Sequence, residues 1–371
     1  MLAQKSPRAT SSIRLMLSTS RWHPGERRII RRDPQGTEVV MPPLFCPFDW
    51  AEHEDGDAVS DGLWRWLDRF AGPDASRVRQ AMKRHGIDTF VQRACSRSSI
   101  EVGQLEAAYF GFLYLFDDRV VDNPTLDAAA AVARIQDALA ALDGRRPASG
   151  DLAFITGVLD VLHEAGWIDR RIAARIHRHT RSYLLGCQWE ILSRARPPSL
   201  ATYLKIRQDA SAVFPCLDFS LLDFARDGAA AALDGPLLTA LETMANNVIS
   251  WSNDIIGMSR ERSAGVENLV TVLRRERKLD WQEAVNAAAD MCDAEMHDFV
   301  AMRENLDVFC GPELQPYRAE LDRYVDVLCT WMSSSMASSP RASASARSSA
   351  RRARPSAIQL PASSMTGRSR S

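Results

Sequence analysis

Residues 109–122 read YFGFLYLFDDRVVD, a run of aromatic and aliphatic residues that ends in a cluster of carboxylates. Burying adjacent carboxylates beside so many apolar side chains costs free energy unless a cation accompanies them. If the run is an α-helix, Asp118 and Asp122 are four residues apart and share a face, while Asp117 lies about 100° away. Carboxylate oxygens are the ligands that Mg²⁺ takes, together with water and substrate phosphates. The stretch therefore predicts either a metal site on a buried helix or a solvated helix end.

A second polar stretch, WSNDIIGMSRE at residues 251–261, also follows apolar sequence. Asn253, Gly257 and Glu261 stand four and eight residues apart and would form one line along a helix. Asn253 and Glu261 would then hold one cation together. The alternative is a capped helix start with an exposed Glu261. Two metal sites on facing helices of an apolar bundle would suit a diphosphate held between them.

The remaining sequence favours an all-α fold in a single domain. Apolar residues recur at three- and four-residue spacing, as in Leu63, Trp66, Leu67 and Phe70. Gly- and Pro-containing breaks separate these segments, and alternating strand-like runs with hairpin turns are missing. We expect one helical bundle around a central apolar cavity.

The two ends differ from this pattern. Residues 1–38 are basic with few periodic apolar positions, and residues 333–371 consist largely of Ser, Ala and Arg. Such composition buries too little apolar surface to fold, so both segments are expected to be disordered. A different interpretation of the tail is that it replaces the native end of the last helix. The folded domain is predicted to span residues 39–332.

Composition excludes several classes of protein. The 371 residues are 46% hydrophobic and 25% charged, with a net charge of −1, which is typical of a soluble globular protein and indicates no nucleic-acid partner. No apolar run reaches the roughly 18 residues of a membrane span. The seven cysteines form no CxxC pair, so we expect reduced thiols, no zinc site and a cytoplasmic location.

The two acidic stretches resemble the signature of bacterial class I terpene synthases, an aspartate-rich DDxxD or DDxxx(D/E) motif followed by NDxx(S/T)xxxE. The first is present here at residues 117–122, and the second runs from Asn253 to Glu261 with Gly257 at its Ser/Thr position. The likeness covers roughly residues 41–332. It includes the following further segments: MPPLFCPFDW at 41–50, Trp189-Glu190, YLKIR at 203–207, FPCLD at 214–218, and Asn268-Leu269-Val270.

The resemblance implies an enzyme that uses three Mg²⁺ ions to remove diphosphate from a linear isoprenyl diphosphate, commonly farnesyl diphosphate, and cyclises the resulting carbocation. The metal-binding positions that it implies are Asp117, Asp118, Asp122, Asn253, Gly257 and Glu261. Homodimers are common among such relatives.

The resemblance also implies residues that contact the substrate. Arg207 lies 46 residues before Asn253, where the family has its diphosphate-sensing arginine, and Arg260 is a second candidate contact. The helix is expected to break after Arg207, which would place Ser211 near the substrate with a catalytic role. Aromatic faces stabilise carbocations. The candidates for such a cavity, each of which is alternatively plain core, are Phe110, Tyr114, Phe214 and Trp251.

Two departures from the family pattern motivate an alternative function. Gly257 lacks the hydroxyl that would ligate the third metal, and the Arg-Tyr pair expected near residues 335–342 is missing from that stretch. The alternative is a degenerate protein that binds isoprenoid diphosphate weakly, or binds nothing. A chain-elongating prenyltransferase would carry two DDxxD motifs, and the Asn-type second motif argues against it.

Overall fold

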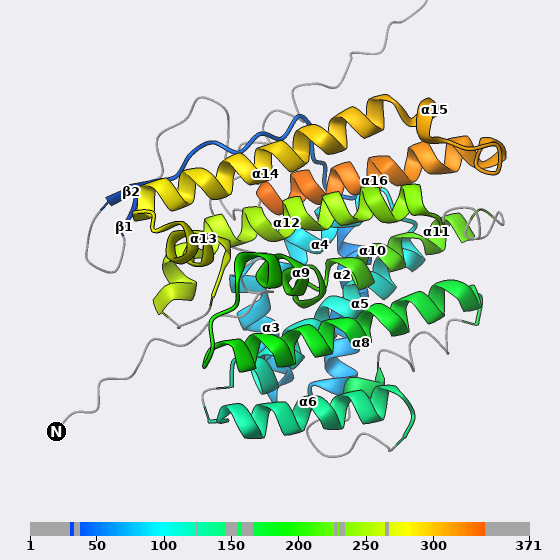
Figure 1. Ribbon diagram of the computed structural model, residues 1–371. Helices are drawn as coiled ribbons and strands as arrows, with labels where there is room; N and C mark the ends of the chain where they lie inside the picture. The colour runs from blue at the N-terminus through cyan, green and yellow to red at the C-terminus, as the bar shows by residue number, and fades with distance from the viewer. Residues whose placement is uncertain are drawn as a thin grey trace, which may run out of the picture.

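Helices make up nearly all of the described chain in the computed structural model (Figure 1). The structure describes residues 30–32, 38–123, 125–145, 154–157, 166–225, 229, 234–263 and 267–337. The α-helices are α2 (Gly56–Phe70), α3 (Ala75–Arg84), α4 (Ile87–Ala94), α5 (Ile100–Phe116), α6 (Ala128–Leu142), α8 (Arg170–Ser193), α9 (Leu200–Ala210), α10 (Val213–Ser220), α11 (Leu222–Ala225), α12 (Pro236–Ser263), α13 (Leu269–Arg277), α14 (Trp281–Glu304), α15 (Leu306–Phe309) and α16 (Arg318–Met336). The predicted all-α class is confirmed.

The apolar stretch that ends at Phe116 forms α5, a helix that is buried along most of its length. Ser99 caps its first turn by accepting a hydrogen bond from Val102 N, and every residue from Glu106 to Phe116 is buried. Helix α2 packs closely along α5 because Gly62 has no side chain; a Cβ atom there would lie 2.2 Å from the Gln104 carbonyl oxygen. A helix that is apolar all round must be surrounded by other helices.

The other long helices surround this pair. Figure 1 shows α12 side by side with α14 and α16 on one side of the molecule, while α8 lies between α6 and α9 on the other. Helix α10 follows α9 along the chain and contacts α5, α8 and α12. The two acidic stretches are thus carried by α5 and α12, with α8 and α9 beside them.

Both domain boundaries differ from the prediction. Ile30–Arg32 (β1) and Glu38–Val40 (β2) pair antiparallel, with Ile30 opposite Val40, although residues 1–38 were expected to be disordered. Gln282 on α14 exchanges two hydrogen bonds with the Val40 backbone, so β2 is held against the bundle. At the other end α16 continues to Met336 instead of stopping at residue 332. Residues 1–29, 33–37 and 338–371 lie outside the described residues.

Helix α16 extends further because its last turn is buried despite its polar sequence. Ser333, Ser334 and Ser335 are all less than 9% exposed, and Ser333 Oγ contacts the Asp49 carbonyl oxygen at 3.2 Å. Hydroxyls whose hydrogen bonds are satisfied by nearby carbonyl oxygens are tolerated inside a helix bundle.

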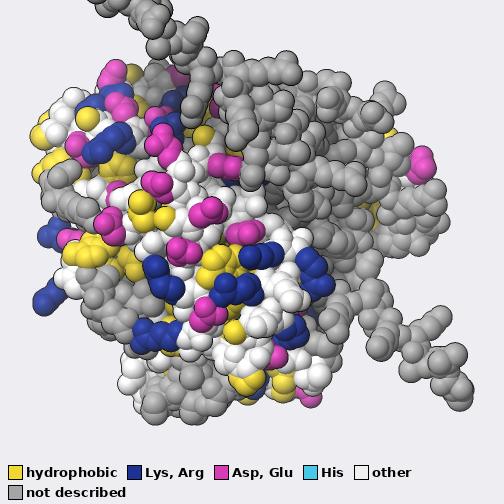
Figure 2. All heavy atoms as spheres, turned by 180° about the vertical axis from the view of Figure 1, so that it is seen from behind, with side chains coloured by type: hydrophobic (Ala, Val, Ile, Leu, Met, Phe, Trp, Pro, Cys, Tyr) yellow, Lys and Arg dark blue, Asp and Glu magenta, His cyan; other side chains and the backbone are white. Residues whose placement is uncertain are grey.

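The surface carries charges of both signs. Figure 2 shows basic and acidic side chains interspersed over the described part of one face, with small hydrophobic areas between them. Exposed ion pairs of this kind contribute about 0–1 kcal/mol each, so the apolar interior carries most of the stability. Within the described ranges, no helix combines the length and hydropathy needed to cross a bilayer. All seven cysteines are free thiols, as expected.

Candidate active site

The first acidic motif lies on a π-helical turn at the end of α5. Residues Asp117–Val121 form this turn, η2, and Asp122 N donates to the Asp117 carbonyl oxygen at 2.8 Å, five residues back. The assumption of α-helical spacing across the motif was therefore wrong, because an i to i+5 bond inserts one extra residue per turn. Single π turns inside α-helices are frequent at functional sites.

The three aspartates differ in their surroundings. Asp117 is 3% exposed, and its Oδ1 accepts a hydrogen bond of 3.0 Å from the Tyr183 hydroxyl on α8. Asp118 is partly exposed and lies 3.5 Å from the Arg77 guanidinium. Asp122 is half-buried at the end of the turn. Asp117 thus faces the bundle interior toward α8, while Asp118 lies nearer the solvent.

The second motif lies on one unbroken helix, α12, as predicted. Asn253 is 5% exposed, and its Oδ1 has no hydrogen-bond partner within the described residues. Gly257 is buried one turn further on. Glu261 and Arg260 belong to the same helix, but their side chains lie outside the described residues.

The donor set fits a hard divalent cation. A buried amide oxygen without a partner costs about 1–3 kcal/mol, and a cation removes that cost by accepting the oxygen as a ligand. The carboxylates of the first motif are ligands of the same kind. Among the described residues no three His, Cys, Asp or Glu side chains cluster as a metal site.

Asp254, next to Asn253, organises the surroundings of Arg207. It is 1% exposed, and its Oδ1 accepts a 2.9 Å bond from Arg207 Nε. Its Oδ2 accepts hydrogen bonds from the Tyr203 hydroxyl and from Leu269 N at the start of α13. Arg207 is itself only 6% exposed. A buried arginine held by a carboxylate in this way has a fixed guanidinium plane.

The predicted break after Arg207 is present. Helix α9 ends at Ala210, Ala212 adopts φ 60° in the left-handed region, and α10 begins at Val213. Ser211 lies in the break, fully buried, with its Oγ 2.9 Å from Asn246 Oδ1 on α12. Val213 N donates to the same Oγ at 3.2 Å. In the described residues the Ser211 hydroxyl therefore stabilises the break itself.

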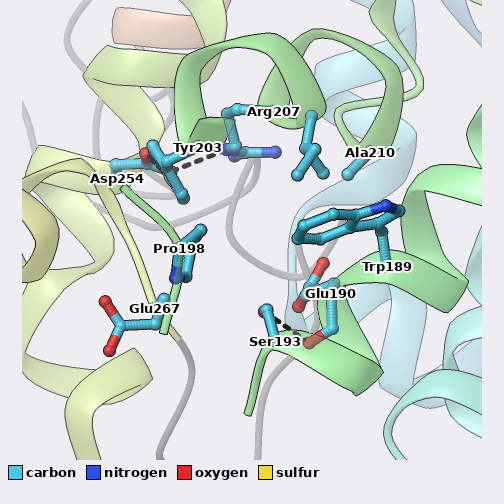
Figure 3. A pocket seen from close by; sticks show the side chains of 10 residues that line it. Trp189, Glu190, Ser193, Pro198, Tyr203, Arg207, Ala210, Asp254 and Glu267 are labelled. Atoms are coloured by element: carbon cyan, nitrogen blue, oxygen red, sulfur yellow. Dashed lines mark hydrogen bonds and ion pairs between the residues drawn. The ribbon is translucent and has the colours of Figure 1, made fainter. Parts of the chain in front are cut away.

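A small pocket, open at one side, lies between α8, α9 and α12 (Figure 3). Arg207 and Asp254 line one end of it, and Trp189 and Glu190 line the other. Burial raises the pKa of Glu190, while the cations Arg194 and Arg207 lower it. The pocket therefore brings the Trp189-Glu190 pair to the same site as the candidate diphosphate arginine.

The four aromatic residues predicted to line the substrate cavity make different contacts in the structure. Phe110 stacks on Trp331 of α16 with ring centroids 6.0 Å apart, and the Tyr114 hydroxyl lies 3.5 Å from His85 Nδ1. Phe214 packs against His179 at 5.4 Å, and Trp251 is buried on α12. None of the four lines the pocket of Figure 3.

Several residues that hold the site together were not predicted from the sequence. Tyr183 binds Asp117, and Tyr203 and Asp254 bind one another beside Arg207. The sequence spacing indicates that Tyr203 lies beside Arg207, because Tyr203 is four residues before it and so lies on the same face of the helix. Nothing in the sequence pairs Tyr183 with Asp117, because 66 positions separate them.

The dipeptide Arg323-Tyr324 has a structural role. Tyr324 is fully buried, and its hydroxyl donates to Glu242 Oε1 on α12 at 2.8 Å. Arg323 lies on the surface over the Phe224 ring. Tyr324 therefore joins α16 to α12 inside the bundle.

Comparisons with known proteins agree with the site. The family profile described as terpene synthase family 2, C-terminal metal binding, matches residues 108–298 and so includes both motifs. The chain is 28% identical to a (+)-T-muurolol synthase of Roseiflexus castenholzii, covering 78% of this chain and 89% of that one. It is 28% identical to a 10-epi-cubebol synthase of Sorangium cellulosum, covering 78% and 93%.

Solved structures support the fold. A hedycaryol synthase in complex with HEPES superposes with a TM-score of 0.68 at 20% identity, covering 81% of this chain and 98% of that one. The profile spans more than half of the chain and includes both acidic motifs, and it implies dependence on a divalent metal. The chain belongs to the bacterial class I terpene synthases, within terpene synthase family 2.

Proposed function

We propose that this terpene synthase cyclises farnesyl diphosphate to a sesquiterpene, with Mg²⁺ as its metal. The muurolol synthase that it resembles along most of both chains is named as a farnesyl-diphosphate-cyclising enzyme. The observation that carries the proposal is on α12, where the unpartnered Asn253 oxygen and the carboxylate that holds Arg207 are consecutive residues. Such an arrangement brings a cation ligand and a phosphate-binding cation to one place.

The metal ligands in this proposal come from both motifs. Asp117, Asp118 and Asp122 would hold ions on one side of the diphosphate, and Asn253 and Glu261 would hold one on the other, giving three in all. Mg²⁺ supplies positive charge that stabilises the departing diphosphate. The missing hydroxyl at Gly257 would be replaced by water, which Mg²⁺ readily keeps.

Side chains of the protein would bind the diphosphate and protect the carbocation. Arg207 and Arg260 would donate hydrogen bonds to the phosphate oxygens. Apolar and aromatic side chains such as Phe110 and Trp251 would exclude water from the carbocation and stabilise it through their ring faces. Ser211 would hold the helix break that lies beside the substrate. A cytoplasmic location and a homodimer complete the proposal.

The test is incubation of the purified chain with geranyl, farnesyl or geranylgeranyl diphosphate and Mg²⁺, followed by mass spectrometry of the extracted products. A cyclic C15 product from farnesyl diphosphate, abolished by chelation and by Asp117→Asn, is expected. Asp298→Asn, at an exposed position on α14, is the matched control and should leave the product unchanged. If only geranyl or geranylgeranyl diphosphate were cyclised, farnesyl diphosphate would be rejected as the substrate. Release of only linear alcohols would favour the degenerate alternative.

A further inference from the structure

Asp254 is the most highly connected carboxylate beside the candidate diphosphate site. Both of its oxygens are used: Oδ1 by Arg207 Nε at 2.9 Å, and Oδ2 by the Tyr203 hydroxyl and by Leu269 N at 3.0 Å. These donors come from α9 and from the first turn of α13, while Asp254 itself is on α12. One buried side chain thus ties three helices together.

The contact with Arg207 has a directional consequence. The guanidinium group is planar, so an acceptor on Nε fixes the plane in which its other N–H groups lie. Both partners are almost completely buried, with side-chain exposures of 7% and 1%. Water therefore does not compete strongly for the pair, and the plane of Arg207 follows the position of Asp254.

Asp254 also shares its helical turn with a candidate metal ligand. Consecutive residues on a helix point about 100° apart, so Asn253 and Asp254 face different neighbours from one rigid segment of α12. Asp254 faces α9 and α13, whereas the Asn253 oxygen has no hydrogen-bond partner among the described residues. A movement of this segment would shift the metal ligand and the arginine together.

We propose that Asp254 is a positioning residue for diphosphate binding: it holds Arg207 in the orientation that meets the phosphate oxygens and keeps it in register with Asn253. Asp254 does not itself contact metal or substrate in this scheme. The inference rests on the proposed function, because it requires a diphosphate at Arg207. A purely structural ion pair would stabilise the fold without affecting diphosphate affinity in an Arg207-dependent way.

A double-mutant cycle distinguishes these cases. Inorganic pyrophosphate with Mg²⁺ is titrated calorimetrically into the wild type, Arg207→Gln, Asp254→Asn and the double variant. Each single substitution is expected to weaken binding about ten- to hundredfold, the loss of a hydrogen bond to a charged group. The double variant should be no weaker than Arg207→Gln, since Asp254 acts only through Arg207. The inference is wrong if the two single losses of pyrophosphate affinity multiply in the double variant. It is also wrong if Asp254→Asn binds pyrophosphate as the wild type does.

Two further variants provide a second measurement of the positioning role and a matched control. Asp254→Asn leaves the Arg207 charge buried without a counter-charge, which destabilises the fold. Tyr203→Phe removes only the hydroxyl that binds Oδ2 and therefore provides a second measurement. It should weaken pyrophosphate binding several-fold, but only when Arg207 is present. Asp209→Asn, two residues from Arg207 on α9, is the matched control and should bind as the wild type does.

The results distinguish failure of the positioning role from failure of the proposed function. If the wild type binds pyrophosphate and the cycle is additive, the positioning role is wrong and the proposed function stands. If the wild type neither binds pyrophosphate nor converts any isoprenyl diphosphate, the proposed function is wrong, and the positioning role is rejected with it.

Discussion

At the scale of single residues, Gly257 is where this chain departs most directly from the second motif. It is buried on α12, one turn after Asn253, and offers no oxygen to an ion. Gly257→Ser would add a hydroxyl in line with Asn253, and we expect the Mg²⁺ concentration for half-maximal activity to fall several-fold, roughly one ligand's contribution. A Mg²⁺ titration of turnover measures this.

Gly257→Ala is the control for that substitution, because it adds the Cβ atom and the helix propensity, worth about 1 kcal/mol, without the oxygen. A shift that Ala reproduces would mean that helix stability, and not ligation, sets the Mg²⁺ requirement. If Gly257→Ser left the Mg²⁺ requirement unchanged or raised it, the missing hydroxyl at residue 257 would not be what limits metal binding.

Glu106 is a second residue with an unusual environment. It is fully buried on α5, where burial raises its pKa to about 8, opposed by hydrogen bonds with Ser220 and Cys95. The ordinary value is 4.5, so between these two pH values the native state holds a proton that the unfolded chain has released. The native state binds more protons there, and stability must fall as pH rises through that window.

Glu106→Gln is therefore expected to flatten the pH dependence of stability. The substitution should change the free energy of unfolding little at pH 5, where the native carboxyl is neutral. The wild type should lose on the order of 3 kcal/mol more than the variant between pH 5 and pH 8, from about 1.4 kcal/mol per pH unit. Urea unfolding at the two pH values measures the difference, and parallel losses in both proteins would contradict the prediction.

At the scale of elements, periodicity predicted the helices and the break after Arg207, but not the π turn. Helical spacing follows from local sequence, whereas the extra residue at Asp117–Val121 accompanies a contact between Asp117 and Tyr183 on a distant helix. The β1–β2 pair was missed for the same reason, since β2 is held by Gln282 of α14. Contacts between distant segments leave no periodic signal in one sequence.

The Tyr183 contact gives a prediction at this scale. Hydrogen bonds from neighbouring side chains orient metal ligands, and their loss typically costs about ten- to hundredfold in metal affinity or activity. Tyr183→Phe should therefore weaken activation by Mg²⁺ about tenfold. Tyr109→Phe is the matched control, because the Tyr109 hydroxyl also bridges α5 and α8, at 3.1 Å from Thr180 Oγ1, but away from the acidic motif. Equal effects of the two substitutions would show that helix packing alone is responsible.

At the scale of the whole molecule, composition and the two motifs were sufficient to predict a single helical bundle and its family. They did not predict how the helices on either side of α5 are joined. Arg175 on α8 lies 2.9 Å from Asp218 on α10 and 2.9 Å from Glu242 on α12, and Tyr324 on α16 also binds Glu242. The partners in these three contacts are 43, 67 and 82 positions apart in the sequence, separations that no local pattern reveals.

This ion network is the strongest candidate for a polar link in the scaffold. Burial raises the pKa of Glu242, and the nearby Arg175 cation opposes that rise, so the carboxylate depends on its arginine. Removing one partner from a buried ion pair typically costs about 3–5 kcal/mol, because a charge remains buried without compensation. Arg175→Gln should accordingly lower the melting temperature by on the order of 10 °C.

The control is Arg318→Gln, whose partners Asp307 and Asp322 are both exposed. Exposed pairs contribute about 0–1 kcal/mol, so this substitution should shift the melting temperature by no more than a few degrees. Calorimetric melts of both variants at neutral pH make the comparison. The argument fails if the two shifts are alike, since the buried network would then add no more than a surface pair, and apolar packing alone would hold α8, α10, α12 and α16 together.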